Sequence, residues 1–317
     1  MAMIEASGLS KNYAGRPVID NVTFSIGEGE IVGLLGLNGA GKSTILKMLG
    51  CFLLPSGGTA RVAGFDVDGD PQAIRSRIGY LPDTPPLYDE MTVDSYLHFV
   101  ARLKDVEAAK VEASVRVAME KTNLLDVGQY RLGELSHGFR QRVGIAQALV
   151  HNPKVLILDE PINGLDPVQI VEMRDLIVSL RGHHTVILSS HILSEITKTC
   201  DRILVIDRGR LVAEGSEADL ERRLTASMRL ICDVVATSPG LLEAIRSVAG
   251  VSSVKESPGS TGVRLIIETE VDVRAAIAQA IVRSGAGLLG MMREDAGLEG
   301  LFMKLVKAAE ADHRRGV

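Results

Sequence analysis

The stretch GLNGAGKST at residues 36–44 constrains this chain more than any other, because it matches the pattern G-x-x-x-x-G-K-[ST]. It follows an apolar run at residues 31–35 and precedes a run at residues 45–49 with helical spacing. The sequence therefore predicts a strand, a glycine-rich loop and a helix in direct succession. Closely spaced backbone N–H groups and the positive end of a helix form a cradle for phosphate groups in that arrangement.

Two side chains of the loop carry further expectations. Lys42 is predicted to reach the outer phosphates of a nucleotide, and the Ser43 hydroxyl to bind Mg²⁺. The predicted phosphate-binding residues are Gly36, Leu37, Asn38, Gly39, Ala40, Gly41, Lys42, Ser43 and Thr44.

Two acidic residues end a second apolar run, VLILDEP at residues 155–161. A fully apolar run of this kind is typical of a buried parallel strand, and ligands bind at the carboxyl edge of such sheets. Asp159 is expected to hold Mg²⁺, and Glu160 to act as the general base for a water that attacks the γ-phosphate.

Two shorter motifs are weaker signals. In LSHGFRQR at residues 135–142, Ser136 is a good helix N-cap and Gly138 lets the backbone approach an anion, although most such turns only cap helices. In the tripeptide SSH after an apolar run at residues 185–188, His191 can donate to a γ-phosphate, although a histidine at a strand end is more often structural.

Strand-like runs alternate with helical patterns over residues 1–224, which predicts a parallel sheet with helices on its faces. The pattern is helical from Thr92, a plausible N-cap, to Ala148. Beyond a boundary near residue 225 the pattern reads strand, helix, strand, strand, helix, strand, which is the split ferredoxin-like order. A terminal helix is predicted at residues 298–309. The expected domains are therefore residues 1–224 and 225–317.

Composition excludes several classes of protein. With 35 basic and 40 acidic residues the net charge is −5, which argues against non-specific nucleic-acid binding. The three cysteines form no CxxC pair, so neither a disulfide framework nor a zinc site is expected. No secretory signal and no continuous apolar stretch of eighteen residues is visible, so no part of the chain is expected to span a bilayer alone.

Taken together, the motifs and their spacing over residues 3–224 resemble the ATP-binding subunit of an ABC (ATP-binding cassette) transporter, of the export-type branch. The resemblance implies an α/β P-loop NTPase cassette, with a RecA-like core, an antiparallel β subdomain and a helical subdomain at about residues 84–150. It implies that Tyr13 stacks on adenine, that Ser136 and Gly138 belong to the signature motif, that Asp166 is the D-loop acid and that His191 is the switch histidine.

The same resemblance implies the cofactors and partners. Two such subunits, by default identical, close head to tail around two ATP molecules with Mg²⁺ and drive a separately encoded permease. The region Asp83–Tyr88 is expected to receive that permease, with the subunit cytoplasmic and peripheral on the inner face of the membrane. Residues 225–317 resemble the small accessory domain of exporter ATPases, and Phe302 fits its terminal helix. No nucleic-acid partner is expected.

The sequence departs from the family pattern at several positions. Asp83 stands where the family usually has a Gln that helps to ligate Mg²⁺, and we expect hydrolysis that is slower or more dependent on the partner. His137 stands in the signature where Gly is common, while Leu37 and Ile162 are conservative replacements. The catalytic candidates are therefore Glu160, His191 and Asp83, and the metal candidates are Ser43, Asp83 and Asp159.

Other classes stay open at this stage. A soluble ABC ATPase that acts on ribosomes or DNA often has two cassettes or long coiled-coil insertions, and neither is visible here. A module that uses ATP only to dimerise would not need Glu160. An unrelated phosphate-loop kinase would not need LSHGFRQR and the element at residues 189–191.

Overall fold

The computed structural model describes residues 2–224, 228–259, 262–269 and 271–294. The chain divides into two compact units, one that extends to Glu217 and one that begins at Ala218. The predicted helix at residues 298–309, with Phe302, lies outside the described residues.

The first unit contains a six-stranded sheet with the order β10-β9-β3-β8-β7-β6. Five of these strands run parallel, and only β10 pairs antiparallel, with β9. Every residue of β3, β7 and β8 is buried, as the apolar runs predict. The predicted parallel sheet is confirmed. Its strands are β3 (Ile31–Leu35), β6 (Ile78–Leu81), β7 (Val155–Leu158), β8 (Thr185–Ser190), β9 (Arg202–Asp207) and β10 (Arg210–Gly215).

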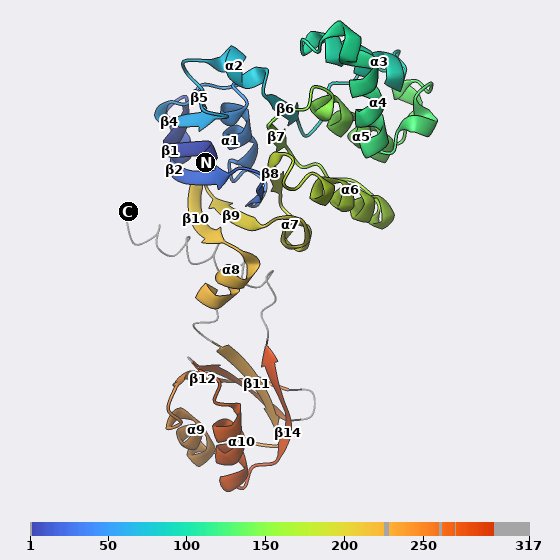
Figure 1. The fold of residues 1–317 in the computed structure, drawn as a ribbon. Helices are drawn as coiled ribbons and strands as arrows, with labels where there is room; N and C mark the ends of the chain where they lie inside the picture. The colour runs from blue at the N-terminus through green and yellow to red at the C-terminus, as the bar shows by residue number, and fades with distance from the viewer. Residues whose placement is uncertain (1, 225–227, 260–261, 270, 295–317) are drawn as a thin grey trace. The chain divides into compact units, whose positions relative to one another are not determined.

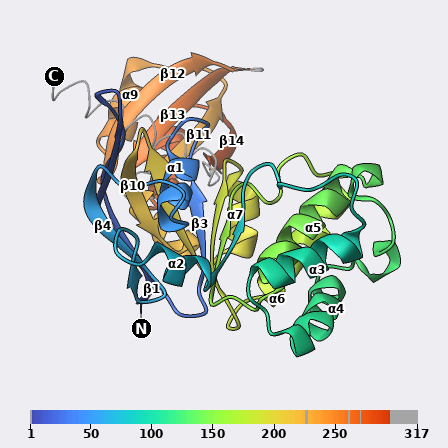
Figure 2. The same cartoon turned by 90° about the horizontal axis from the view of Figure 1, so that it is seen from above.

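A four-stranded antiparallel sheet with the order β2-β1-β4-β5 covers the helix that follows the glycine-rich loop. One hydrophobic core contains residues of both sheets and of helix α1, so α1 is enclosed between the sheets (Figure 2). The elements are β1 (Ala2–Tyr13), β2 (Arg16–Gly27), α1 (Lys42–Leu49), β4 (Gly57–Val62), β5 (Phe65–Asp66) and α2 (Pro71–Arg75).

Three helices form a separate bundle beside the parallel sheet, with their own hydrophobic core (Figures 1 and 2). The Thr92 side chain accepts a hydrogen bond from Ser95 N–H and caps α3, as predicted. The helices are α3 (Val93–Leu103), α4 (Val111–Lys121) and α5 (His137–Leu149), with 3-10 turns η1 (Ala108–Lys110), η2 (Leu125–Val127) and η3 (Leu132–Glu134). Two helices connect the later strands, α6 (Pro167–Ser179) and α7 (Leu193–Thr199).

The second unit is an antiparallel sheet with the order β12-β13-β11-β14 and a core shared with two helices. Its elements are α8 (Glu217–Leu224), β11 (Met228–Val234), α9 (Pro239–Arg246), β12 (Val251–Pro258), β13 (Val263–Thr269), α10 (Arg274–Arg283) and β14 (Leu288–Glu294). Within the described part of the chain, no helix combines the length and apolar character needed to cross a bilayer.

Candidate nucleotide-binding site

The glycine-rich loop lies at the carboxyl end of β3 and leads directly into α1. Gly41 caps α1 with φ of 106°, a conformation that favours glycine. A side chain at Gly36 would place its Cβ 2.5 Å from the Ile206 carbonyl oxygen, so the loop approaches β9 too closely for any other residue. The loop is therefore a tight backbone turn at a helix N-terminus, which is a site for anions.

The hairpin between β9 and β10 supports this loop, a contact that the sequence patterns did not predict. Gly209 N–H donates to the Ala40 carbonyl at 2.8 Å, and the Gly209 carbonyl accepts from Asp20 N–H at 2.9 Å. A Cβ on Gly209 would lie 2.1 Å from the Val18 carbonyl oxygen. Arg208 and Gly209 both have positive φ, as a two-residue hairpin turn requires, and this Arg-Gly pair was the available sequence signal.

Lys42 is buried, and its ammonium contacts both the glycine-rich loop and Glu160 of the VLILDEP motif. Its Nζ donates to the Gly36 carbonyl at 2.8 Å and lies 3.1 Å from Glu160 Oε1. The same carboxylate lies 3.0 Å from Nδ1 of His191 through Oε2. The structure thus brings together Lys42, Glu160 and His191, which the sequence placed in three separate motifs.

Asp159 is held by two hydroxyl groups at the end of β7. Ser43 Oγ donates to its Oδ1 at 3.0 Å, and Ser189 Oγ donates to the same oxygen at 2.7 Å. Burial raises the pKa of the Asp159 carboxyl, the two hydroxyl donors oppose that rise, and the nearby charges of Asp83 and Glu160 add to it. The contact of Ser189 with Asp159 was not anticipated from the sequence.

Glu160 has a backbone φ of 50°, which is uncommon for a residue with a side chain. Its N–H donates to Ser189 Oγ at 2.8 Å, so one hydroxyl contacts both acidic residues. The site opens into a pocket of about 560 Å³. Its lining residues are Val18, Asn38, Gly39, Ala40, Gly41, Lys42, Ser43, Thr44, Asp83, Glu160, Asn163 and His191.

The donor set fits a magnesium nucleotide. Hydroxyl and carboxylate oxygens of Ser43, Asp159 and Asp83 are the ligand type that Mg²⁺ prefers, and Ser43 and Asp159 are already in contact. Among the described residues, no group of three or more His, Cys, Asp or Glu side chains is arranged to hold a metal ion. Mg²⁺ is usually bound by one or two carboxylates together with waters and substrate phosphate oxygens, and Ser43, Asp159 and Asp83 would supply the protein part of such a set.

Other predicted site residues are not among those that line this pocket. Tyr13 ends β1 with 47% of its surface exposed, and Lys11 Nζ lies 5.4 Å from its ring centre. Ser136 caps α5 as predicted, by accepting from Phe139 N–H. Asp166 caps α6, since its side chain accepts from the N–H groups of residues 168 and 169.

Gly138 has a second reason to be glycine besides approach to an anion. It is buried, and a Cβ there would lie 2.6 Å from the Gln169 side chain on α6. None of Ser136, Gly138 and Asp166 lines the pocket beside Lys42. Within one subunit, the structure does not bring the LSHGFRQR motif to the phosphate loop.

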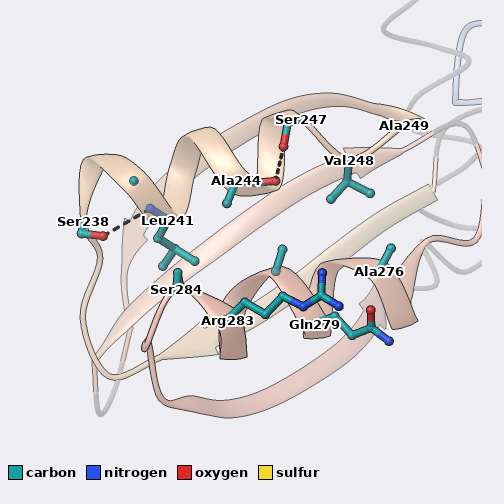
Figure 3. A pocket seen from close by; sticks show the side chains of 12 residues that line it. Ser238, Leu241, Ala244, Ser247, Val248, Ala249, Ala276, Gln279, Arg283 and Ser284 are labelled. Carbon is teal, nitrogen blue, oxygen red and sulfur yellow. Dashed lines mark hydrogen bonds between the residues drawn. The ribbon is translucent and has the colours of Figure 1, made fainter.

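A pocket of about 680 Å³ lies elsewhere, between α9 and α10 of the second unit (Figure 3). Small side chains such as Ala244, Ser247 and Ala280 line it, with Arg283 as the one charged residue among the described residues around it. None of those residues is an acid, a histidine or a cysteine, whereas the pocket beside Lys42 is lined by Asp83, Glu160 and His191.

The fold and the site define a P-loop nucleotide-binding protein, with the phosphate loop, the acidic strand end and the histidine at one sheet edge. The sequence model of the family described as ABC transporter matches residues 19–163. The chain is 31% identical over 306 residues to the uncharacterized ABC transporter ATP-binding protein YxlF of Bacillus subtilis, covering 96% of this chain and 100% of that one.

Two further relatives agree. The Nod factor export ATP-binding protein I of Ralstonia nicotianae is 31% identical, over 96% of this chain and 93% of its own length. A solved ATP-binding subunit of an ABC transporter superposes with a TM-score of 0.65 at 31% identity, covering 70% of this chain and 93% of that one. This chain therefore belongs to the ABC transporter ATP-binding proteins, and its first unit has the ABC cassette fold.

Proposed function

We propose that this protein hydrolyses ATP as the motor subunit of an ABC exporter. The observation that carries the proposal is the position of Glu160, whose carboxylate lies between Lys42 and His191 at the mouth of the phosphate loop. A carboxylate at that place is suited to accept a proton from a water that attacks the γ-phosphate. Ser43, Asp159 and Asp83 are the residues that would hold Mg²⁺, which when bound would neutralise charge on the phosphates.

Two subunits are proposed to close around two ATP molecules. Ser136 and Gly138 do not line the pocket of their own subunit, so in this account they complete the pocket of a partner. Identical subunits make two complete sites by symmetry, which is the simplest arrangement. Adenine is proposed to stack on Tyr13, whose ring is exposed.

The permease is proposed to contact the region that begins at Asp83. Tyr88 and Phe99 are exposed aromatic residues there, with ring centres 5.9 Å apart and an edge-to-face arrangement. Phe52, which follows α1, is 62% exposed and packs against Tyr80 with ring centres 4.6 Å apart and a tilt of 44°. Exposed aromatic groups of this kind are enriched at protein interfaces. The subunit would then be cytoplasmic and bound to the inner face of the membrane through the permease.

Export is supported by the Ralstonia relative, whose name specifies export of Nod factor. The second unit is proposed to be a ferredoxin-like accessory domain of residues 225–317, consistent with its β-α-β-β-α-β element order and its strand order. A dimerisation or regulatory role is the simplest proposal for it.

Two measurements test this function. Purified protein is expected to release phosphate from ATP in the presence of Mg²⁺ and to stop when the metal is chelated. When a photocrosslinking amino acid replaces Tyr88 in cells that express the protein, illumination is expected to crosslink the protein to an integral membrane protein. Absence of ATP turnover both alone and in membranes with the trapped partner would contradict the motor assignment.

A further inference from the structure

The start of α5 lies against the turn that follows Glu160. The His137 ring donates through Nε2 to the Asn163 carbonyl at 3.1 Å. The same ring lies over Gly164, where a Cβ would be 3.1 Å from Nε2 and where φ is 74°. A histidine in the helical bundle is thus in direct contact with the loop between β7 and α6.

That loop carries the proposed general base. Asn163 N–H donates to the Glu160 carbonyl at 3.1 Å and closes a tight turn, and Asn163 also lines the nucleotide pocket. Glu160 has the left-handed φ of 50°, which costs conformational energy in a residue with a side chain. A backbone held this way persists only where its surroundings fix it, and two contacts do so. Ser189 accepts from the Glu160 N–H at one end, and His137 donates to Asn163 at the other.

On the α5 side of the contact between His137 and Asn163, the helix start is fixed by several interactions. Ser136 caps α5 immediately before His137, and Gly138 packs directly on Gln169 of α6. One turn further along, Arg142 on α5 pairs with Glu172 on α6. Since the N-terminal halves of α5 and α6 are joined at these points, the His137 backbone has a fixed position relative to the turn.

We infer that His137 is a positioning residue for Glu160, which holds the turn of residues 160–163 through its hydrogen bond to the Asn163 carbonyl. His137 does not line the nucleotide pocket of its own subunit, so within that subunit it acts through Asn163. The inference rests on the proposed role of Glu160 in ATP hydrolysis. The bond is exposed, so its loss is expected to change the rate by a modest factor and not to abolish the reaction.

Three variants test the inference. His137→Leu removes the donor while keeping an apolar side chain over Gly164. His137→Gln places an amide N–H at the same number of bonds from Cα as Nε2 and restores the donor. His183→Leu makes the same change at an exposed histidine in the turn before β8, away from the pocket. The readouts are kcat and KM for ATP and the hydrogen exchange of backbone amides in residues 160–166.

His137→Leu is expected to lower kcat roughly three- to tenfold with KM unchanged, and to speed amide exchange in residues 160–166. His137→Gln is expected to recover most of both values, and His183→Leu to match the wild type. The inference would be overturned if His137→Leu changed neither kcat nor the amide exchange of residues 160–166. It would also be overturned if His137→Leu lowered kcat and His137→Gln did not restore it. If the wild type fails to turn over ATP, the proposed function fails, and exchange in the same segment still decides whether His137 holds the turn.

Discussion

The ammonium of Lys42 lies 3.1 Å from a carboxylate oxygen of Glu160, and both groups are largely buried. One cation thus contacts the phosphate loop, through the Gly36 carbonyl, and the proposed general base. A phosphate that entered the loop would compete with Glu160 and Gly36 for this ammonium. We therefore expect phosphate binding to be coupled to the freedom of the Glu160 carboxylate through the Lys42 side chain.

Removal of Lys42 should for this reason weaken nucleotide binding. Lys42→Ala removes a charged hydrogen-bond donor and leaves Glu160 without its cation, so affinity for ATP is expected to fall roughly 10- to 100-fold. Lys47→Ala removes an exposed lysine from the same helix and serves as the control. Titration with a fluorescent ATP analogue measures both, and equal affinity of Lys42→Ala and wild type would contradict the assignment.

Replacement of Asp83 should change the basal rate. Asp83 lines the pocket with Glu160, and its charge acts on Asp159, so it adds negative charge where the γ-phosphate is expected. Asp83→Gln restores the residue usual in the family and is expected to raise ATP turnover of the isolated subunit severalfold. A rate that is the same for both proteins, with and without the permease, would show that Asp83 does not slow or condition hydrolysis.

A methyl group at Gly138 should disturb the contact between α5 and α6. In Gly138→Ala the new Cβ would lie 2.6 Å from the Gln169 side chain, which must move. The free energy of unfolding is expected to fall by about 1–3 kcal/mol, as for other overpacked sites. The double variant Gly138→Ala, Gln169→Ala is expected to recover most of this loss in urea denaturation. If the effects of the two substitutions on the free energy of unfolding were additive, the destabilisation by Gly138→Ala would not arise from its contact with Gln169.

Acid should destabilise the protein partly through His151. Burial, with a further contribution from the Lys104 charge, lowers the pKa of His151 from 6.5 to about 4, and its Nε2 bonds the Ile78 carbonyl. Between pH 6.5 and about pH 4, His151 is protonated in the unfolded chain but neutral in the folded chain. Stability is therefore lost as pH falls through this window, by about 2 kcal/mol at pH 5 from this group.

His151→Gln removes the titrating group and keeps an N–H for the Ile78 carbonyl. Urea titrations at pH 7 and pH 5 give the loss of unfolding free energy on acidification for the wild type and for the variant. The drop on acidification is expected to be about 2 kcal/mol smaller in the variant. An equal drop in both proteins would mean that other groups account for the acid sensitivity.

Local sequence patterns predicted much of this structure. The loop at residues 36–44, the buried strand before Asp159 and the caps Ser136 and Thr92 each depend on neighbours within a few residues, so their signals are local. The strand β10 was missed because it is a half-exposed edge strand with weak alternation, and only its Arg208-Gly209 turn marked it.

Contacts between distant segments could not be predicted in the same way. Ser189 on β8 contacts Asp159 at the end of the neighbouring strand β7, and Gly209 bonds the phosphate loop from the turn after β9. His137 contacts Asn163, which lies 26 residues further along the chain. Each of these depends on strand order and helix placement, which residue patterns leave open. The sequence therefore predicted which residues form the site but not which groups hold them in place.

Glu160 is, in our proposal, the general base of a dimer that closes around ATP. The most direct measurement compares ATP turnover and size-exclusion profiles of wild type and Glu160→Gln in ATP and Mg²⁺. The account predicts at least a hundredfold lower turnover in the variant and a stable ATP-bound dimer, because binding is retained while the base is lost. Turnover equal to wild type in Glu160→Gln would contradict the account.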